Sequence, residues 1–354
     1  MTDEPEVLFE KRGCAGIVTL NRPKALNALT LEMVRAMHPQ LIDWANDPDV
    51  AHVLVRGAGE KAFCAGGDIR KLHDWGKAND PIAQTFYAEE YRLNAYIKAY
   101  PKPYVALIDG IDMGGGVGVS VHGSHRVAGS KMMFAMPETG IGFFPDVGGT
   151  YFMPRLPGHI GTWMALSGAR LGQADAVWAG IATHAVASEK FEALTEALCE
   201  NSNVRATLDS FSEEPTGETL PGLQTVIDRC FSAGSVEEIL ERLDAESDFD
   251  REWAAKAAAT IRKKSPTSLK IALRQMQLGA EADFEACMRI EARVVRRVFE
   301  GHDFFEGVRA VIIDKDNAPK WQPDSLAGVS DADIDAYFAP LGDDELDLSG
   351  LDTR

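Results

Sequence analysis

One segment of the sequence, residues 134–150, sets two carboxylic acids among apolar residues and glycines. Burial disfavours the ionised form of a carboxyl group, so Glu138, beside Met136 and Ile141, is expected to have a raised pKa suited to general acid–base work. Asp146 would act at the same site by orienting water or a substrate hydroxyl. The plainer alternatives are an exposed Glu138 at a strand end and an Asp146 that only complements the next helix N-terminus.

Two further segments are glycine-rich turns, each placed between an expected strand and an expected helix. Residues 61–70 contain Gly66 and Gly67, and residues 108–118 contain three successive glycines at 114–116. Such turns let a ligand approach the backbone closely, although many serve only as structural turns. Neither has the spacing of a phosphate loop or a dinucleotide fingerprint. Together they could form a two-donor oxyanion hole, worth about 3–4 kcal/mol per donor where charge develops.

Other catalytic patterns are missing from the sequence. His122 and His125 have no third Cys, Asp or Glu at ligand spacing, so a structural or surface role is favoured over metal binding. The five cysteines are scattered without a C-x-x-C pair, which indicates free thiols. The absence of G-x-S-x-G argues against a Ser-His-Asp hydrolase. We therefore expect neither a metal nor a cofactor.

Composition and charge restrict the class of protein. With 354 residues, of which 45% are hydrophobic, the chain can bury the core of one large domain or two smaller ones. The net charge of -18 would repel nucleic acid and anionic membranes, so neither is an expected partner. The first residues lack a signal-peptide pattern and no apolar run approaches transmembrane length, from which we expect a cytoplasmic protein.

The expected elements place these segments on an α/β scaffold. A hairpin is predicted from residues 7–11 and 16–21, followed by an amphipathic helix over 30–46 with Thr30 as its N-cap. Apolar strands at 51–56, 104–108 and 125–128 then alternate with helices at 82–99 and 115–121, which indicates an α/β class.

The second half of the sequence is expected to be mainly helical. From about Ile160 the strand signal fades, and helical patterns dominate at residues 190–200, 236–243, 250–263 and 268–278. Residues 210–222 are polar and contain Pro and Gly, so we expect a loop or linker there. The tail carries Asp343, Asp344, Glu345, Asp347 and Asp352 and is expected to be either a mobile acidic end or a docking strip.

In this order, the three glycine and carboxylate segments resemble the crotonase (enoyl-CoA hydratase/isomerase) superfamily. The similarity runs from residues 16–23, Gly-Ile-Val-Thr-Leu-Asn-Arg-Pro, through Leu156, and segments at 265–270 and 304–321 extend it to nearly the whole chain. The resemblance implies a crotonase-like spiral of ββα units over residues 1–205, which carries the active site. It implies a mainly helical region over 206–354 that completes the CoA site and the subunit contacts of a homo-oligomer.

The resemblance also implies roles for individual residues. The oxyanion donors would be the N–H groups of Gly67 and Gly115, acting on an acyl-CoA in which CoA is part of the substrate. The substrate and CoA contacts carried over are Lys24, Ala65, Gly66, Asp68, Ile69, Arg70 and Gly114. Because CoA is polyanionic and this chain is acidic, local basic residues are needed, and the candidates are Arg22, Lys24, Lys61, Arg70 and Lys71.

Two positions indicate a hydrolase branch of that family. Hydratases of the family use two glutamates; Glu138 matches one, but the other falls on Gly118, and Asp146 stands where many hydratases carry glycine. The similarity therefore implies hydrolysis of a short-chain 3-hydroxyacyl-CoA in valine breakdown, with Glu138 attacking the carbonyl or deprotonating water. The alternatives are a 2-enoyl-CoA hydratase or isomerase, and a non-catalytic CoA- or RNA-binding relative.

Overall fold

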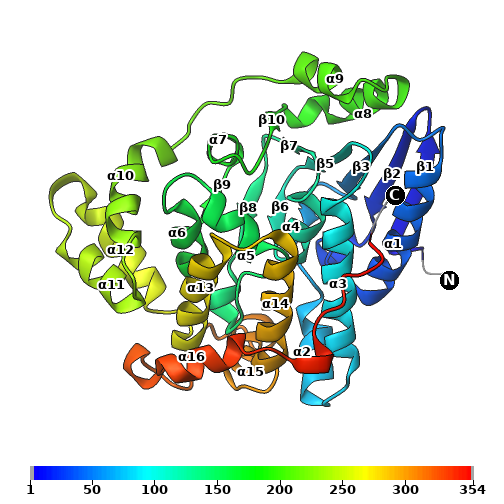
Figure 1. Ribbon diagram of the computed structural model, residues 1–354. Coiled ribbons are helices and arrows are strands. Elements are labelled where there is room, and N and C mark those ends of the chain that lie inside the picture. The colour runs from blue at the N-terminus through cyan, green and yellow to red at the C-terminus, as the bar shows by residue number, and fades with distance from the viewer. Residues whose placement is uncertain (1–3, 352–354) are drawn as a thin grey trace.

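The computed structural model describes residues 4–351, which form two β-sheets surrounded by helices (Figure 1). In the larger sheet the strand order is β1-β2-β3-β5-β7-β10, and in the smaller one it is β4-β6-β8-β9. The larger sheet contains β1 (Val7–Arg12), β2 (Ala15–Leu20), β3 (His52–Gly57), β5 (Tyr104–Ile108), β7 (His125–Ala128) and β10 (His184–Ala185). The smaller sheet contains β4 (Ala62–Cys64), β6 (Ile111–Met113), β8 (Met133–Ala135) and β9 (Arg170–Leu171).

Successive strand pairs build a spiral, because each pair contributes one strand to each sheet. The pairs β3/β4, β5/β6 and β7/β8 repeat this step, and their strands run parallel within both sheets. The spiral of ββα units expected from the sequence is thus confirmed. Because β4, β6 and β8 are parallel neighbours, the residues after their carboxyl ends meet along one edge of the small sheet.

The N-terminal helices follow the sequence pattern closely. They are α1 (Leu31–Asn46), α2 (Ile69–Lys77), α3 (Ile82–Lys98) and α4 (Gly115–Ser120). The Thr30 hydroxyl accepts a hydrogen bond of 3.1 Å from the Met33 N–H, which confirms the predicted N-cap. Met33, Met37 and Leu41 are buried on one face of α1, as their three- and four-residue spacing predicts.

The remaining helices form the C-terminal half. They are α5 (Gly149–Phe152), α6 (Ile160–Ser167), α7 (Gln173–Trp178), α8 (Phe191–Glu200), α9 (Val204–Phe211), α10 (Leu220–Phe231), α11 (Val236–Ala245), α12 (Arg251–Ile261), α13 (Pro266–Gly279), α14 (Phe284–Val298), α15 (Asp303–Val308) and α16 (Asp331–Phe338). A π-helical turn, Arg309–Ile313, continues α15. Helices α13 and α14 pack on α5, and α14 also packs on α3 (Figure 1). The helical region therefore lies directly against the spiral.

Three local expectations need revision. The predicted loop over 210–222 is shorter, since α9 ends at Phe211 and α10 begins at Leu220. The strands of the smaller sheet, β4, β6, β8 and β9, and the short strand β10 were not among the expected strands. The acidic tail docks on the body, because Leu346 and Leu348 are buried and Glu345 forms an ion pair of 2.8 Å with Arg293 of α14. Asp352 of the same tail lies outside the described residues.

Candidate active site

A cavity of about 400 Å³ opens at the edge of the small sheet where the three chemistry-bearing segments meet. Both halves of the chain supply its walls, including Lys264, Val311 and Ile312 from the C-terminal region. The lining residues are Ala65, Gly66, Gly67, Ile69, Leu72, Phe86, Tyr87, Glu90, Met113, Gly114, Gly115, Pro137, Glu138, Gly140, Ile141, Phe143, Asp146, Lys264, Val311 and Ile312. Most of these side chains are apolar, so charged groups in the cavity are poorly solvated.

The amides of Gly67 and Gly115 converge at this cavity. A methyl group on Gly115 would stand 3.1 Å from the Gly67 nitrogen, which places the two residues against each other. Gly115 is the first residue of α4, so its N–H has no acceptor within the helix. Within residues 4–351 neither N–H donates a hydrogen bond. Two free donors at one point are the arrangement that an oxyanion hole requires.

Glu138 lies beside these amides at the start of a 3-10 turn, Glu138–Ile141. Only 7% of the residue is exposed, and Oε2 has no hydrogen-bond partner among the described residues. Burial raises the pKa of Glu138 well above its ordinary value, and the nearby Asp146 charge adds to this rise, while the Lys264 ammonium opposes it. Glu138 is therefore a strongly basic carboxylate once it is ionised.

Asp146 is the second carboxyl group in the cavity, and its environment differs from that of Glu138. Burial raises the pKa of Asp146 to about 7, whereas a hydrogen bond from the Tyr91 hydroxyl opposes the rise. The distance from Tyr91 Oη to Asp146 Oδ2 is 2.9 Å. Because this hydrogen bond favours the ionised form, Asp146 should ionise before Glu138 as pH increases.

Sequence reasoning missed a third carboxyl group, Glu90 of α3. Glu90 is buried, lines the cavity, and has an Oε1 atom without a partner in the described part of the chain. That oxygen would lie 2.6 Å from a methyl group on Gly115. Burial raises the pKa of Glu90 well above its ordinary value, and the charge of Asp146 also raises it. The spacing of Phe86, Glu90 and Asn94 at four-residue steps could have placed Glu90 on the buried face of the helix.

The predicted CoA contacts separate into two groups. Ala65, Gly66, Ile69 and Gly114 line the cavity, whereas Lys24, Asp68 and Arg70 do not. The Asp68 carboxylate instead pairs with Arg22 at 3.0 Å and caps the N-terminus of α2.

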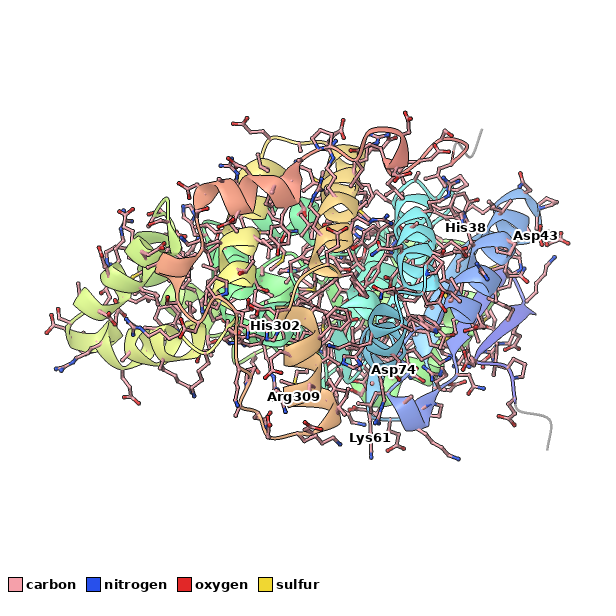
Figure 2. All side chains as sticks on the ribbon, turned by 90° about the horizontal axis from the view of Figure 1, so that it is seen from below. His38, Asp43, Lys61, Asp74, His302 and Arg309 are labelled. Carbon is pink, nitrogen blue, oxygen red and sulfur yellow. The ribbon has the colours of Figure 1, made fainter. Side chains whose placement is uncertain are left out.

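The basic candidates lie at or near the surface. Lys24, Lys61 and Arg70 are exposed, and Figure 2 shows Lys61 at the lower margin of the view. A contact between these side chains and the distal part of CoA stays a prediction.

The position of the absent hydratase glutamate is filled by other residues. A methyl group on Gly118 would lie 2.7 Å from Asn94 Nδ2 and 2.9 Å from the Val147 Cβ. A longer side chain at residue 118 therefore has no room without movement of α3 or of the loop that carries Asp146. His122 lies against the same loop, where Nε2 is 2.7 Å from the Val147 carbonyl oxygen, in keeping with a structural role.

Residues 4–351 contain no cluster of three or more His, Cys, Asp or Glu side chains that could hold a metal ion. None of the helices in that range is both long and apolar enough to cross a bilayer. The expectation that no metal or cofactor takes part stays a prediction.

A family model described as enoyl-CoA hydratase/isomerase matches residues 15–338. The chain belongs to this family. Among relatives, the Danio rerio protein named 3-hydroxyisobutyryl-CoA hydrolase, mitochondrial, is 52% identical over 97% of this chain and 92% of its own length. The Homo sapiens protein of the same name is 48% identical over 96% of this chain and 90% of its own length.

Two solved structures of the enoyl-CoA hydratase/isomerase family share the fold over nearly the whole chain. A carnitinyl-CoA dehydratase from Mycobacterium thermoresistibile has a TM-score of 0.93 and 43% identity, covering 98% of this chain and all of its own. An enoyl-CoA hydratase from Rhodobacter sphaeroides has a TM-score of 0.90 and 40% identity, covering 97% of this chain and all of its own.

The comparisons correct one expectation. A cytoplasmic protein was expected from the sequence. The relatives that share about half of their residues with this chain are named mitochondrial, which contradicts that expectation. That expectation rested on the acidic first residues and on the absence of a signal-peptide pattern. A signal peptide directs secretion, so its absence says nothing about import into an organelle.

Proposed function

We propose that the chain hydrolyses 3-hydroxyisobutyryl-CoA to 3-hydroxyisobutyrate and CoA, a step of valine breakdown. The observation that carries the proposal is the proximity of two free amides, at Gly67 and Gly115, to the buried Glu138 and Asp146 carboxyl groups. The relatives named as hydrolases of this thioester support the choice of substrate. A thioester carbonyl held by the amides would lie in the same cavity as both carboxyl groups.

In one route, Glu138 acts as a general base. It takes a proton from water while the water oxygen forms a bond to the thioester carbon, and the carbonyl electron pair moves to an oxyanion held by the two amides. The oxyanion then collapses, the C–S bond breaks, and the electron pair leaves on the CoA sulfur, which takes the proton from Glu138. The raised pKa of Glu138, caused by burial, suits both proton transfers.

In the other route, Glu138 is a nucleophile. A Glu138 oxygen attacks the thioester carbon, the C–S bond breaks, and the CoA sulfur leaves with the electron pair, so that a mixed anhydride links Glu138 to the acyl group. Water then cleaves the anhydride: the water oxygen bonds to the acyl carbon, the bond from that carbon to the Glu138 oxygen breaks, and Glu138 leaves as a carboxylate. One water proton stays on the acid product and the other passes to the CoA sulfur. In both routes Asp146 orients the water or the 3-hydroxyl group of the substrate, and the Tyr91 hydroxyl holds one Asp146 oxygen in place.

A second candidate function is hydration or isomerisation of a 2-enoyl-CoA. It is favoured by the two similar structures, whose titles describe a dehydratase and a hydratase. It is opposed by Gly118, since the place of a second catalytic glutamate is occupied by Asn94 and Val147.

The proposal includes no cofactor, because each step uses only protein groups and water. We also propose that the chain forms a homo-oligomer. The net charge of -18 would repel nucleic acid and anionic membranes, so we propose that it binds neither. Light scattering during size exclusion would test the oligomeric part, and a monomer at working concentration would contradict it.

The substrate is tested with a panel of acyl-CoA thioesters. Free thiol release is measured for 3-hydroxyisobutyryl-CoA, 3-hydroxybutyryl-CoA and acetyl-CoA, and loss of the double-bond absorbance is measured for crotonyl-CoA. We expect the highest kcat/KM for thiol release from 3-hydroxyisobutyryl-CoA and no change of crotonyl-CoA absorbance. Fast hydration of crotonyl-CoA without thiol release would overturn the proposal in favour of the hydratase.

A further inference from the structure

The loop that carries Asp146 has a strained backbone. Val147 has a φ angle of +48° and Gly148 has a φ angle of +88°. A β-branched residue rarely adopts a positive φ angle, and such a conformation persists only where the surroundings hold it. The strain immediately follows Asp146, so whatever holds the turn also fixes the direction of the Asp146 side chain.

A buried glutamate from the C-terminal region holds this turn. Glu291 of α14 is fully buried, and its two carboxyl oxygens accept hydrogen bonds from two backbone N–H groups of the loop, at residues 148 and 150. Oε2 accepts from the Gly148 N–H at 2.8 Å, and Oε1 accepts from the Thr150 N–H at 2.9 Å. Glu291 does not line the cavity, so it cannot touch the substrate there.

Two neutral side chains support the same loop from other directions. His122 Nε2 is 2.7 Å from the Val147 carbonyl oxygen. Gln275 of α13 donates to the Pro145 carbonyl oxygen at 3.1 Å and to the Thr150 hydroxyl at 2.8 Å. These contacts fix the two ends of the turn and the Val147 carbonyl. The Gly149 N–H donates to the Asp146 carbonyl oxygen at 2.8 Å. Among the side chains of residues 4–351, only Glu291 accepts from the Gly148 and Thr150 N–H groups. Loss of Glu291 would leave the Gly148 and Thr150 N–H donors buried without an acceptor, which is unfavourable.

We propose that Glu291 is a positioning residue for Asp146: its buried carboxyl group holds the turn, which is strained at Val147, and so directs the Asp146 side chain into the cavity. The inference rests on the proposed function, because it assigns to Asp146 a part in hydrolysis. It also means that the helical region fixes the orientation of Asp146, in addition to its proposed contribution to the CoA site. Without Glu291, the turn relaxes and Asp146 leaves the 2.9 Å hydrogen bond with Tyr91.

A double-mutant cycle separates positioning from simple structural support. The variants are Glu291→Ala, Asp146→Asn and the combination of both, assayed by thiol release from 3-hydroxyisobutyryl-CoA well below their Tm. We expect Glu291→Ala to lower kcat at least 10-fold with KM changed less than 3-fold. In the Asp146→Asn background the same change should lower kcat less than 3-fold, because the group that Glu291 positions is already lost. Additive losses of kcat would overturn the proposal.

A control is available in a half-buried carboxylate that also binds a backbone N–H at a helix start. Asp228 of α10 accepts a hydrogen bond of 2.8 Å from the His159 N–H before α6, and it does not line the cavity. Asp228→Asn should lower Tm while kcat stays within 2-fold of the wild type. If Glu291→Ala behaved in the same way, Glu291 would be a cap without a positioning role. Glu291→Gln keeps one acceptor oxygen, so an intermediate kcat is expected from it, and it serves where Glu291→Ala does not fold.

A second measurement does not depend on catalysis. Hydrogen exchange followed by mass spectrometry should show faster exchange in peptides covering residues 144–152 in Glu291→Ala than in the wild type. Peptides from β1 and β2 should exchange unchanged. An inactive wild type with this local acceleration would reject the proposed function but keep Glu291 as the support of the turn. Unchanged exchange at 144–152 would reject the inference whether or not the enzyme hydrolyses the thioester.

Discussion

The hydroxyl of Tyr91 donates a hydrogen bond of 2.9 Å to Oδ2 of Asp146 inside a cavity wall made largely of apolar side chains. This single contact distinguishes the two buried carboxyl groups. Burial raises the pKa of both Asp146 and Glu138, but a donor to Asp146 opposes the rise there, whereas the charge of Asp146 raises the pKa of Glu138 further. The pair is therefore arranged so that Asp146 ionises first and Glu138 retains the higher basicity.

Replacing Tyr91 with Phe should shift one inflection on the acidic side of the pH–rate profile. Two inflections are expected there, because Asp146 ionises first and Glu138 at higher pH. The Tyr91 hydrogen bond lowers the pKa of Asp146, so its loss raises that pKa above about 7 and moves the lower inflection to higher pH. A hydrogen bond to a charged group is worth about 1.5–3 kcal/mol, so kcat/KM at pH 7 should fall about 10-fold or more. Tyr100→Phe is the control, because Tyr100 donates at 2.9 Å to the Leu41 carbonyl oxygen, away from the cavity. An unshifted lower inflection would contradict the role given to Tyr91.

Replacing Asp146 with Asn should change the pH dependence of stability. The pKa of Asp146 is raised from 3.8 to about 7, so the folded state holds the proton more tightly than the unfolded state between these values. Wild-type stability therefore falls as pH rises through this window, by about 1.4 kcal/mol per unit for one group. Asn does not titrate, so the Tm of Asp146→Asn relative to that of the wild type should increase from pH 4 to pH 7. A difference in Tm between the two proteins that stays the same from pH 4 to pH 7 would refute the raised pKa of Asp146.

Replacing Gly115 with Ala should damage catalysis more than folding. The added methyl group would lie 2.6 Å from Glu90 Oε1 and 3.1 Å from the Gly67 nitrogen, in the space needed by the thioester oxygen. The variant keeps the backbone N–H of residue 115, but the methyl group blocks the approach of the thioester oxygen to it. Losing the use of one oxyanion donor costs about 2.7–4 kcal/mol, so kcat should fall about 100-fold or more. Gly172→Ala is the matched control, since nothing lies within 4 Å of a methyl group there and its φ angle is -85°. Equal activity of the two variants would exclude Gly115 from the oxyanion site.

Replacing Gly118 with Glu should not create a hydratase. The new side chain would collide with Asn94 and Val147, so the Asp146 loop must move. We expect a lower Tm, weaker thiol release from 3-hydroxyisobutyryl-CoA, and no hydration of crotonyl-CoA. The checks are differential scanning fluorimetry, the thiol assay and the crotonyl-CoA absorbance assay. Efficient hydration by this variant would show that one missing glutamate alone separates the two activities.

Local patterns predicted the strands of the larger sheet except β10, because burial and turn chemistry agree there, whereas the spiral followed from the resemblance to the crotonase superfamily. The strand at 104–108 and the cap at Thr30 are cases in which propensity, burial and turn chemistry agree. The short strands β9 and β10 were missed because two residues carry no readable periodicity.

The candidate site was predicted where the chemistry lies in contiguous motifs, as at Gly67, Gly115 and Glu138. It was missed where distant elements contribute single side chains. Glu90 comes from the middle of α3, Lys264 precedes α13, and Glu291 reaches the loop from α14. Only the packing of the helical region on the spiral brings them together, and no short spacing in the sequence encodes that packing. The docking of the tail through Leu346 and Leu348 has the same origin.

The most direct measurement is the rate of CoA thiol release from 3-hydroxyisobutyryl-CoA by the wild type and by Glu138→Gln, across pH 5 to 9. Gln has nearly the same shape but cannot take a proton or attack the carbonyl, so kcat should fall about 100- to 10,000-fold while the Tm is kept or raised. Such a loss in a folded variant is the predicted result. Turnover of Glu138→Gln within a few-fold of the wild type would contradict acyl transfer driven by this carboxylate.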